Sequence, residues 1–152
     1  MERICHRCGY MNGIEVDPIN TRGGLCLAWR NDICIELRSF SKRHIDVVVE
    51  DKEVKGKWRL TGFYGSPYAQ DMSESWNVLR NLHNDDGRPW FVCGDFNEIM
   101  YSHKKKGGLP CDERKMENFR IVLVDCELLD VGFSGNWFTW ERGNLPETNI
   151  RE

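Results

Sequence analysis

A short apolar run that ends on an acidic residue constrains this chain more than any other feature. The run covers Trp90 to Cys93, passes through Gly94 and stops at Asp95, and Asn97 follows two positions later. A run of this length and composition favours a buried strand. Because residues i and i+2 of an extended segment point to the same side, we expect Asp95 and Asn97 to face one way and Phe96 to turn back into the core.

Polar side chains at such a strand end suit attack on a phosphate or a carbonyl group. The carboxylate of Asp95 can orient or deprotonate a water molecule, and the amide of Asn97 can donate a hydrogen bond to a developing oxyanion. Tyr64 ends a second apolar run, and its hydroxyl can donate to a phosphate oxygen. Taken singly, a strand-end Asp is more often a turn former and a strand-end Tyr a rim residue. Their co-occurrence favours a functional edge.

The first half of the chain has the alternation and β-branched content of strands. We predict strands over residues 25–29, 33–40, 44–50 and 57–64, with a turn at Asn31-Asp32. Four successive strands joined by short turns are typical of an antiparallel meander.

Helical spacing replaces this alternation further along the chain. Residues 71–83 are predicted to form an amphipathic helix in which Asp71 and Glu74 make a capping box. Asp112 is predicted to cap a second helix. The apolar stripe of this second helix consists of Met116, Phe119, Leu123 and Cys126. A last short strand is predicted over Phe138 to Trp140. This mixture favours a layered α/β or α+β sandwich over a parallel doubly wound fold.

The charge balance excludes a globally basic nucleic-acid binder. With 152 residues, the chain suits one domain, and its net charge is -3 with a pI of about 5.8. Any phosphate-rich partner must therefore be held by a local patch or through a metal. Lys104 to Lys106 could contact phosphates, although a solvated charged loop is the more ordinary interpretation. Five tryptophans could stack on bases, but most of them lie in strand patterns, and we expect packing in the core instead. They are Trp29, Trp58, Trp90, Trp137 and Trp140.

The cysteines and the apolar segments bear on the compartment. Seven cysteines, with no secretory leader at the N-terminus, favour an intracellular protein with free thiols. The CxxC spacing of Cys5 and Cys8 lacks a second ligand pair, so ordinary cysteines are favoured over a zinc site. No apolar run approaches a bilayer-spanning length, and we expect no membrane partner. His44 and His83 are expected to have structural roles.

Several segments together resemble a known superfamily. Gly94-Asp95-Phe96-Asn97 resembles the GDFN motif of the endonuclease/exonuclease/phosphatase superfamily. Further matching segments follow the expected order, at Gly23 to Trp29, Trp58 to Gly65, Gly107-Gly108, Gly132 to Gly135 and Phe138 to Trp140. From about Gly13 onward, the string is most similar to the endonuclease region of plant LINE-type retrotransposons.

The resemblance implies a four-layered α/β sandwich that cleaves DNA phosphodiester bonds with Mg²⁺ or Mn²⁺. It implies that Asp95 activates the attacking water, Asn97 holds the scissile phosphate and Tyr64 hydrogen-bonds that phosphate. The Tyr-x-Pro of the family is replaced here by Tyr64-Gly65-Ser66-Pro67. The segment around Thr139 and Trp140 would support the site from below. Such a nuclease would be nuclear if it acts on genomic DNA.

The resemblance also implies that residues 1–152 are a single partial domain, truncated at both ends. We find neither the strand that ends in the metal-ligating glutamate nor the terminal Ser-Asp-His segment. Phosphodiester hydrolysis relies on a metal to offset charge, and residues that act as a unit lose activity together. We therefore expect little nuclease activity and poor metal binding, assign no metal ligand, and expect bare sheet edges.

Two alternatives remain open. The first is a phosphatase or phosphodiesterase of the same superfamily that acts on inositol phosphates or another small substrate. The second is a non-catalytic relic or binding module that keeps the fold without turnover. Metal titration and substrate choice separate these alternatives from a DNA endonuclease.

Overall fold

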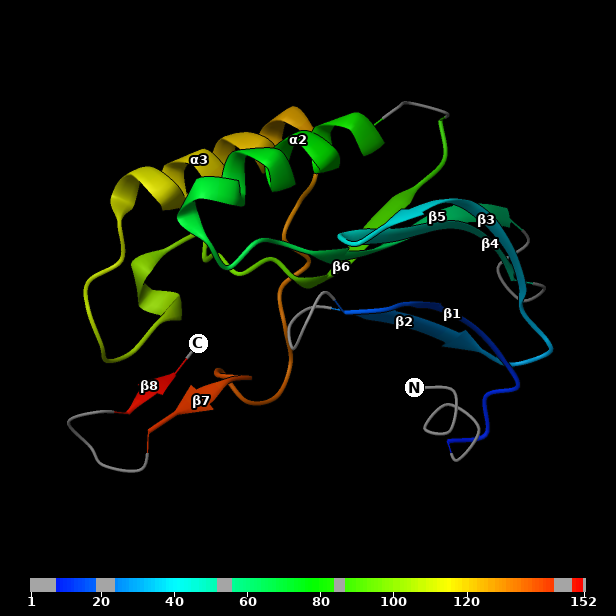
Figure 1. Ribbon diagram of the computed structural model, residues 1–152, viewed down its shortest axis with the longest axis horizontal. Coiled ribbons are helices and arrows are strands. Elements are labelled where there is room, and N and C mark those ends of the chain that lie inside the picture. The colour runs from blue at the N-terminus through cyan, green and yellow to red at the C-terminus, as the bar shows by residue number, and fades with distance from the viewer. Residues whose placement is uncertain (1–7, 19–23, 52–55, 84–86, 144–148, 152) are drawn as a thin grey trace. The chain divides into compact units, whose positions relative to one another are not determined.

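A computed structural model describes residues 8–18, 24–51, 56–83, 87–143 and 149–151. The chain divides into two compact units. The first unit comprises Met1–Ser75 with Asn84–Phe96, and the second comprises Trp76–His83 with Asn97–Glu152. Figure 1 shows the order of the elements along the chain. The assignment of residues 1–152 to one partial domain stays a prediction.

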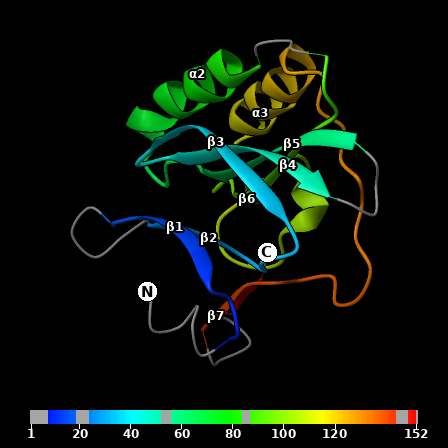
Figure 2. The same ribbon diagram turned by 90° about the vertical axis from the view of Figure 1, so that its right-hand side faces the viewer.

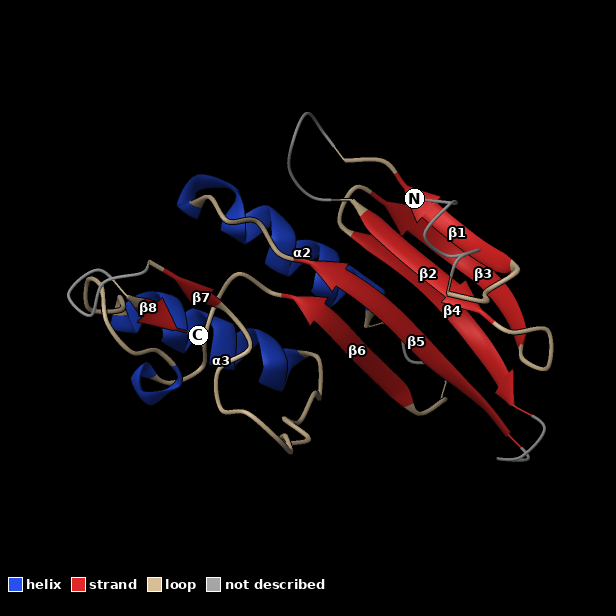
Figure 3. Ribbon diagram, turned by 90° about the horizontal axis from the view of Figure 1, so that it is seen from below, coloured by secondary structure: helices blue, strands red, loops and turns tan. Residues whose placement is uncertain are grey.

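A four-stranded mixed sheet forms the centre of the first unit. Its strands lie in the order β3 (Cys34–Ser41), β4 (His44–Asp51), β5 (Gly56–Tyr64) and β6 (Trp90–Asp95). The first three strands are antiparallel neighbours, and β6 runs parallel to β5 (Figure 3). The predicted meander is therefore confirmed for three of its four strands.

The fourth strand of the predicted meander pairs elsewhere. β2 (Leu25–Trp29) forms a separate two-stranded antiparallel sheet with β1 (Asn12–Val16), which the sequence analysis did not predict (Figure 2). The short segment of β1 contains a glycine and an acid, so its alternation is a weak signal.

The two faces of the four-stranded sheet are chemically different. On one face, Ile45, Val47 and Val49 are buried beneath apolar side chains of the small sheet, including Ile14 and Leu27. The opposite face carries buried polar residues, namely His44, Asp46, Arg59 and Thr61. Because successive strand residues point to opposite faces, Ile45, Val47 and Val49 of β4 line the apolar face, whereas His44, Asp46 and the buried Val48 lie on the other.

α2 (Met72–Leu82) follows a short 3-10 turn, η1 (Ala69–Asp71), on the connection from β5 to β6. The helix agrees with the predicted span of 71–83 to within one residue at each end. It begins in the first unit and ends in the second. Asp71 lies in the 3-10 turn, where its carbonyl accepts a hydrogen bond from the Ser75 hydroxyl at 3.3 Å.

Two helical segments pack together in the second unit. The Trp76 ring, in the part of α2 that belongs to this unit, stacks on Phe119 of α3 (Glu113–Asp125), with ring centroids 5.0 Å apart. The buried side chains around this stack are Leu79, Leu82, Met116, Val122 and Cys126. Asp112 caps α3 as predicted, because its carboxylate accepts from the Arg114 amide at 3.0 Å.

The end of the second unit differs from the sequence-based expectation. The remaining elements are η2 (Ser102–Lys104), β7 (Glu141–Arg142) and β8 (Ile150–Arg151). The predicted strand over Phe138 to Trp140 is wrong, since β7 begins only at Glu141 and Trp140 is exposed. Within α3, Val122 is buried while Leu123 is half-buried. The mixed sheet and the two helices confirm the predicted α/β class.

Candidate functional site

Tyr64 and Asp95 lie side by side at one end of the mixed sheet. They are the last residues of β5 and β6, and they are register partners in the parallel pair. The Asp95 side chain is exposed and Tyr64 is half-buried. The backbone fixes this arrangement, because the Gly65 amide donates to the Asp95 carbonyl oxygen at 2.8 Å. Two of the three predicted site residues are thus brought together.

Two glycines allow the strand ends to approach so closely. A Cβ atom on Gly65 would lie 2.0 Å from the carbonyl oxygen of Phe96, and one on Gly94 would lie 2.0 Å from that of Phe63. Gly94 also has a φ of 140°, a conformation that favours glycine. The Phe96 ring contacts the buried Phe63 ring, with centroids 5.4 Å apart. This contact confirms that Phe96 turns back toward the core.

Asn97 follows a change in backbone direction. β6 ends at Asp95, and Asn97 has a φ of 53°, in the left-handed region that asparagine tolerates better than most residues. The alternation of an extended strand therefore does not continue to Asn97. Asn97 opens the part of the chain assigned to the second unit, and its place beside Asp95 stays a prediction.

The loop after Tyr64 is fixed although it departs from the Tyr-x-Pro pattern. The Ser66 amide donates to the Ser75 hydroxyl at 3.0 Å, and both residues are buried. The Tyr68 amide donates to the Ser66 hydroxyl at 3.3 Å. These bonds tie the loop to the start of α2, so the extra residue is accommodated by side-chain hydrogen bonds.

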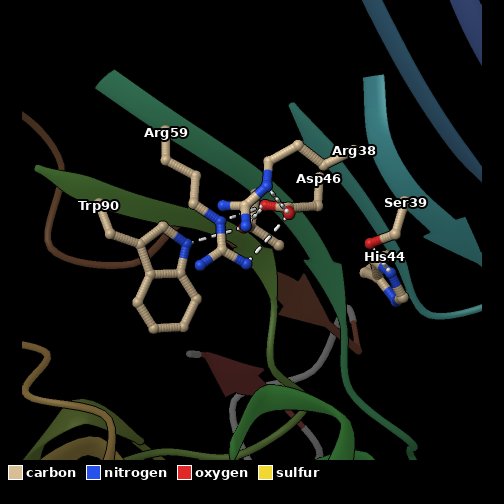
Figure 4. Close-up of polar contacts among 7 residues, drawn as sticks. Arg38, Ser39, His44, Asp46, Arg59 and Trp90 are labelled. Carbon is tan, nitrogen blue, oxygen red and sulfur yellow. Dashed lines mark hydrogen bonds and ion pairs between the residues drawn. The ribbon is translucent and has the colours of Figure 1, made fainter. Parts of the chain in front are cut away.

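A buried polar network joins the strands that carry the site (Figure 4). Asp46 on β4 accepts from Arg59 Nε at 2.8 Å and Nη2 at 3.0 Å, and from the Thr61 hydroxyl at 2.6 Å. The Trp90 indole on β6 donates to the Thr61 hydroxyl at 2.8 Å, and the Arg59 guanidinium lies 4.7 Å from the centroid of the Trp90 ring. The network therefore locks β4, β5 and β6 in register, which in turn positions Tyr64 and Asp95.

His44 belongs to the structural part of this face. Its Nε2 lies 3.0 Å from the Ser39 hydroxyl and its Nδ1 lies 2.8 Å from the Ser41 hydroxyl (Figure 4). Burial lowers the pKa of His44, the charge of Asp46 opposes that shift, and Arg59 adds to it. A neutral ring that bridges two hydroxyls fits the structural role expected for His44.

The basic loop of the second unit, Lys104 to Lys106, makes contacts with other residues of the same unit. Lys104 Nζ contacts Asp130 Oδ2 at 2.8 Å, and this hydrogen bond is the main reason that the pKa of Asp130 is lowered. The backbone of Lys106 exchanges hydrogen bonds with Arg151 at 2.9 and 3.0 Å. The ion pair favours a structural role for Lys104, whereas the backbone bonds of Lys106 hold the loop without involving its ammonium group.

Several aromatic residues of this unit are more exposed than predicted. Trp137 and Trp140 are about half exposed, so core packing was the wrong expectation for both. The Trp137 ring instead meets Phe133 edge-on at 5.1 Å and His103 at 6.0 Å. Trp137, Phe133 and His103 are thus exposed rings, and Trp137 contacts the other two.

A metal centre does not emerge from the described side chains. Within that part of the chain, no three His, Cys, Asp or Glu residues gather closely enough to hold an ion. Cys8 is exposed, and Cys5 of the CxxC pair lies outside the described residues. The search of the described helices finds none with the length and hydropathy of a membrane span.

Comparison with known proteins gives one family match. A family model described as the Endonuclease/Exonuclease/phosphatase family matches residues 5–148. A search of curated proteins found no match. The matched span includes the mixed sheet, both helices and all three predicted site residues.

Proposed function

The chain belongs to the endonuclease/exonuclease/phosphatase family, and from this premise we propose that it is a hydrolase of DNA phosphodiester bonds. The observation that carries the proposal is the pairing of Tyr64 with Asp95 across the ends of β5 and β6. An exposed carboxylate beside a phenol supplies both a base and a hydrogen-bond donor to one bound phosphate.

In this proposal each site residue has one task. Asp95 orients the attacking water and accepts its proton, which its exposure at the strand end allows. Tyr64 donates its hydroxyl proton to a non-bridging phosphate oxygen. Asn97 donates its amide to the same phosphate as charge develops on it.

Members of this family generally depend on a divalent metal. The described residues do not gather a donor set that fits such an ion, so no step of the proposal passes through it. The carboxylate, the phenol and the amide contribute through orientation and hydrogen bonding.

Nicking of supercoiled plasmid in the presence of Mg²⁺ or Mn²⁺ tests the proposal. We expect Asp95→Asn to abolish nicking and Tyr64→Phe to reduce it. Asp32→Asn is the matched control, because Asp32 is an exposed carboxylate in the turn before β3. Nicking that survives Asp95→Asn unchanged would refute the proposal. The rate of the unsubstituted chain also measures the impairment expected from the sequence.

The same preparation separates the alternatives. Release of phosphate from inositol phosphates, without nicking, would show that the substrate is a small phosphate ester and not DNA. Absence of both activities, together with absence of Mg²⁺ or Mn²⁺ binding by titration, would support a non-catalytic module.

We also propose that the chain derives from a plant LINE-type retrotransposon, because Gly23 to Trp29 and Thr61 to Gly65 accompany the GDFN motif. The flanking genomic sequence tests this origin. A reverse-transcriptase reading frame in the same gene is expected, and its absence together with an unrelated flanking gene would refute the origin.

A further inference from the structure

A basic hairpin turn lies next to Tyr64 at the proposed active edge. β3 ends at Ser41 and β4 begins at His44, so Lys42 and Arg43 form the turn. Because β4 runs antiparallel to β5, this turn meets the end of β5. The Tyr64 amide donates to the Arg43 carbonyl oxygen at 2.8 Å.

The strand register extends this neighbourhood into a row. His44 pairs with Phe63, so Arg43 stands opposite Tyr64, and Tyr64 in turn pairs with Asp95. We call Arg43, Tyr64 and Asp95 the edge row. No local pattern in the sequence marks Arg43, since only the strand pairing brings it to this edge.

The Arg43 side chain is buried and incompletely satisfied. The residue is 8% exposed, and its buried Nε has no hydrogen-bond partner among the described residues. Glu74 Oε1 lies 3.8 Å from that nitrogen, beyond hydrogen-bond distance. Leaving a charged donor buried and unmatched is costly. Because this cost is already present in the free protein, a ligand that supplies the missing acceptor removes it and thereby binds more tightly.

Lys42 supplies a second cation at the same turn. Lys42 Nζ lies 3.7 Å from the same Glu74 oxygen, and both of these side chains are about half exposed. Two cations therefore share the Glu74 carboxylate on one side of Tyr64, and the Asp95 carboxylate lies on its other side. A guanidinium suits a phosphate because its planar donors match the phosphate oxygens.

We propose that Lys42 and Arg43 form an anion subsite in which the Arg43 guanidinium binds a phosphate group of the substrate beside Tyr64. This inference rests on the proposed function and deepens it, because it names the cation that holds the phosphate. Glu74 occupies the cations in the absence of substrate and competes with the phosphate for them.

Inorganic phosphate is the first probe. The melting temperature is measured in phosphate and in chloride at equal ionic strength, since a ligand that binds only the folded state raises it. We expect Arg43→Gln to weaken the apparent phosphate affinity about 10-fold or more, as loss of a charged hydrogen bond implies. Glu74→Gln should strengthen the affinity, because it removes the competing carboxylate.

Matched controls lie at the opposite end of β5. Lys57 and Glu50 form an exposed pair at 3.2 Å, so Lys57→Gln and Glu50→Gln change the same charges far along the strands. Neither control should alter the response to phosphate beyond a general screening effect.

A short DNA duplex is the second probe. Its affinity is measured over a range of salt concentrations. Loss of one phosphate contact should reduce the slope of log K against log salt by about 0.9, so Arg43→Gln should show this decrease. Arg43→Lys should keep the slope and lose affinity, because it retains the charge and lacks the planar fork.

The outcomes distinguish the subsite from a structural role. If Arg43 only anchors Glu74, both Arg43→Gln and Glu74→Gln lower stability and leave the phosphate response unchanged, which would overturn the inference. If Arg43→Gln does not fold, the expected gain in Glu74→Gln still decides the question. A plasmid that is never nicked, with phosphate responses as expected, refutes the proposed hydrolase and keeps the subsite. Nicking together with unaltered phosphate responses supports the hydrolase and refutes the subsite.

Discussion

Replacing Arg59 by methionine removes one half of the buried ion pair that joins β4 to β5. Asp46 is 1% exposed and would lose two hydrogen bonds, at 2.8 and 3.0 Å, while the bond from Thr61 remains. Methionine retains much of the aliphatic volume, so the main cost is a buried carboxylate whose remaining cation is the partly exposed Arg38, with its Nε 3.8 Å from Asp46 Oδ2. Breaking a buried pair from one side typically costs about 3–5 kcal/mol. The lost contact with the Trp90 ring adds about 0.5–2 kcal/mol at most.

Amide hydrogen exchange of β4 and β5 is the appropriate assay, because it reports the opening free energy of this unit alone. Because Arg38 still compensates part of the Asp46 charge, we expect Arg59→Met to lower that free energy by about 3 kcal/mol, the lower end of this range. Such a loss is a large share of the roughly 5–15 kcal/mol that stabilises a typical domain.

Two comparisons make the reasoning refutable. The double variant Asp46→Leu with Arg59→Met removes both charges, and we expect it to recover most of the loss. Lys57→Ala breaks an exposed pair on the same two strands and should cost less than about 1 kcal/mol. A small effect of Arg59→Met, equal to that of Lys57→Ala, would show that the buried network does not hold the strands together.

Further predictions concern the close strand ends, the buried histidine and the helix cap. Gly65→Ala places a Cβ atom 2.0 Å from a carbonyl oxygen and should weaken both urea resistance and nicking, whereas Gly62→Ala, whose nearest contact is 3.9 Å away, should cost much less. Because the pKa of His44 is lowered in the folded state, its neutral form is favoured there, so stability should be fully present above pH of about 6.5. It should fall as the pH drops toward the folded pKa, and His44→Gln should flatten that part of the urea-denaturation profile; an unchanged profile would contradict the assignment. Asp112→Ala should cost about 0.5–2 kcal/mol in urea denaturation, whereas no change would show that the cap bond is not stabilising.

Local patterns predicted most of the regular elements. The alternation in β4 and β5, and the spacing of Trp76, Leu79 and Leu82 in α2, depend on near neighbours and can be seen in one sequence. β1 was missed because its five residues carry a weak pattern. The pairing of β2 with β1 could not be seen either, since pairing is a property of distant segments.

The candidate site divides in the same way. The position of Asp95 at a strand end follows from the apolar run before it, and its neighbour Tyr64 from a similar run. The direction of Asn97 was inferred from extended geometry, which ends one residue after Asp95 because Asn97 adopts a positive φ. Arg43 acquires meaning only through the β4–β5 register, which no local pattern contains.

The parallel pairing of β6 has a consequence for how the protein acquires its site. The hairpins of β3, β4 and β5 close short loops, whereas β6 joins β5 only after residues 65–89 have crossed over. Closing a longer loop costs more entropy and slows the contact it makes. Asp95 should therefore reach Tyr64 late during folding, after the hairpins are complete, so that early intermediates hold the phenol in place without its acid.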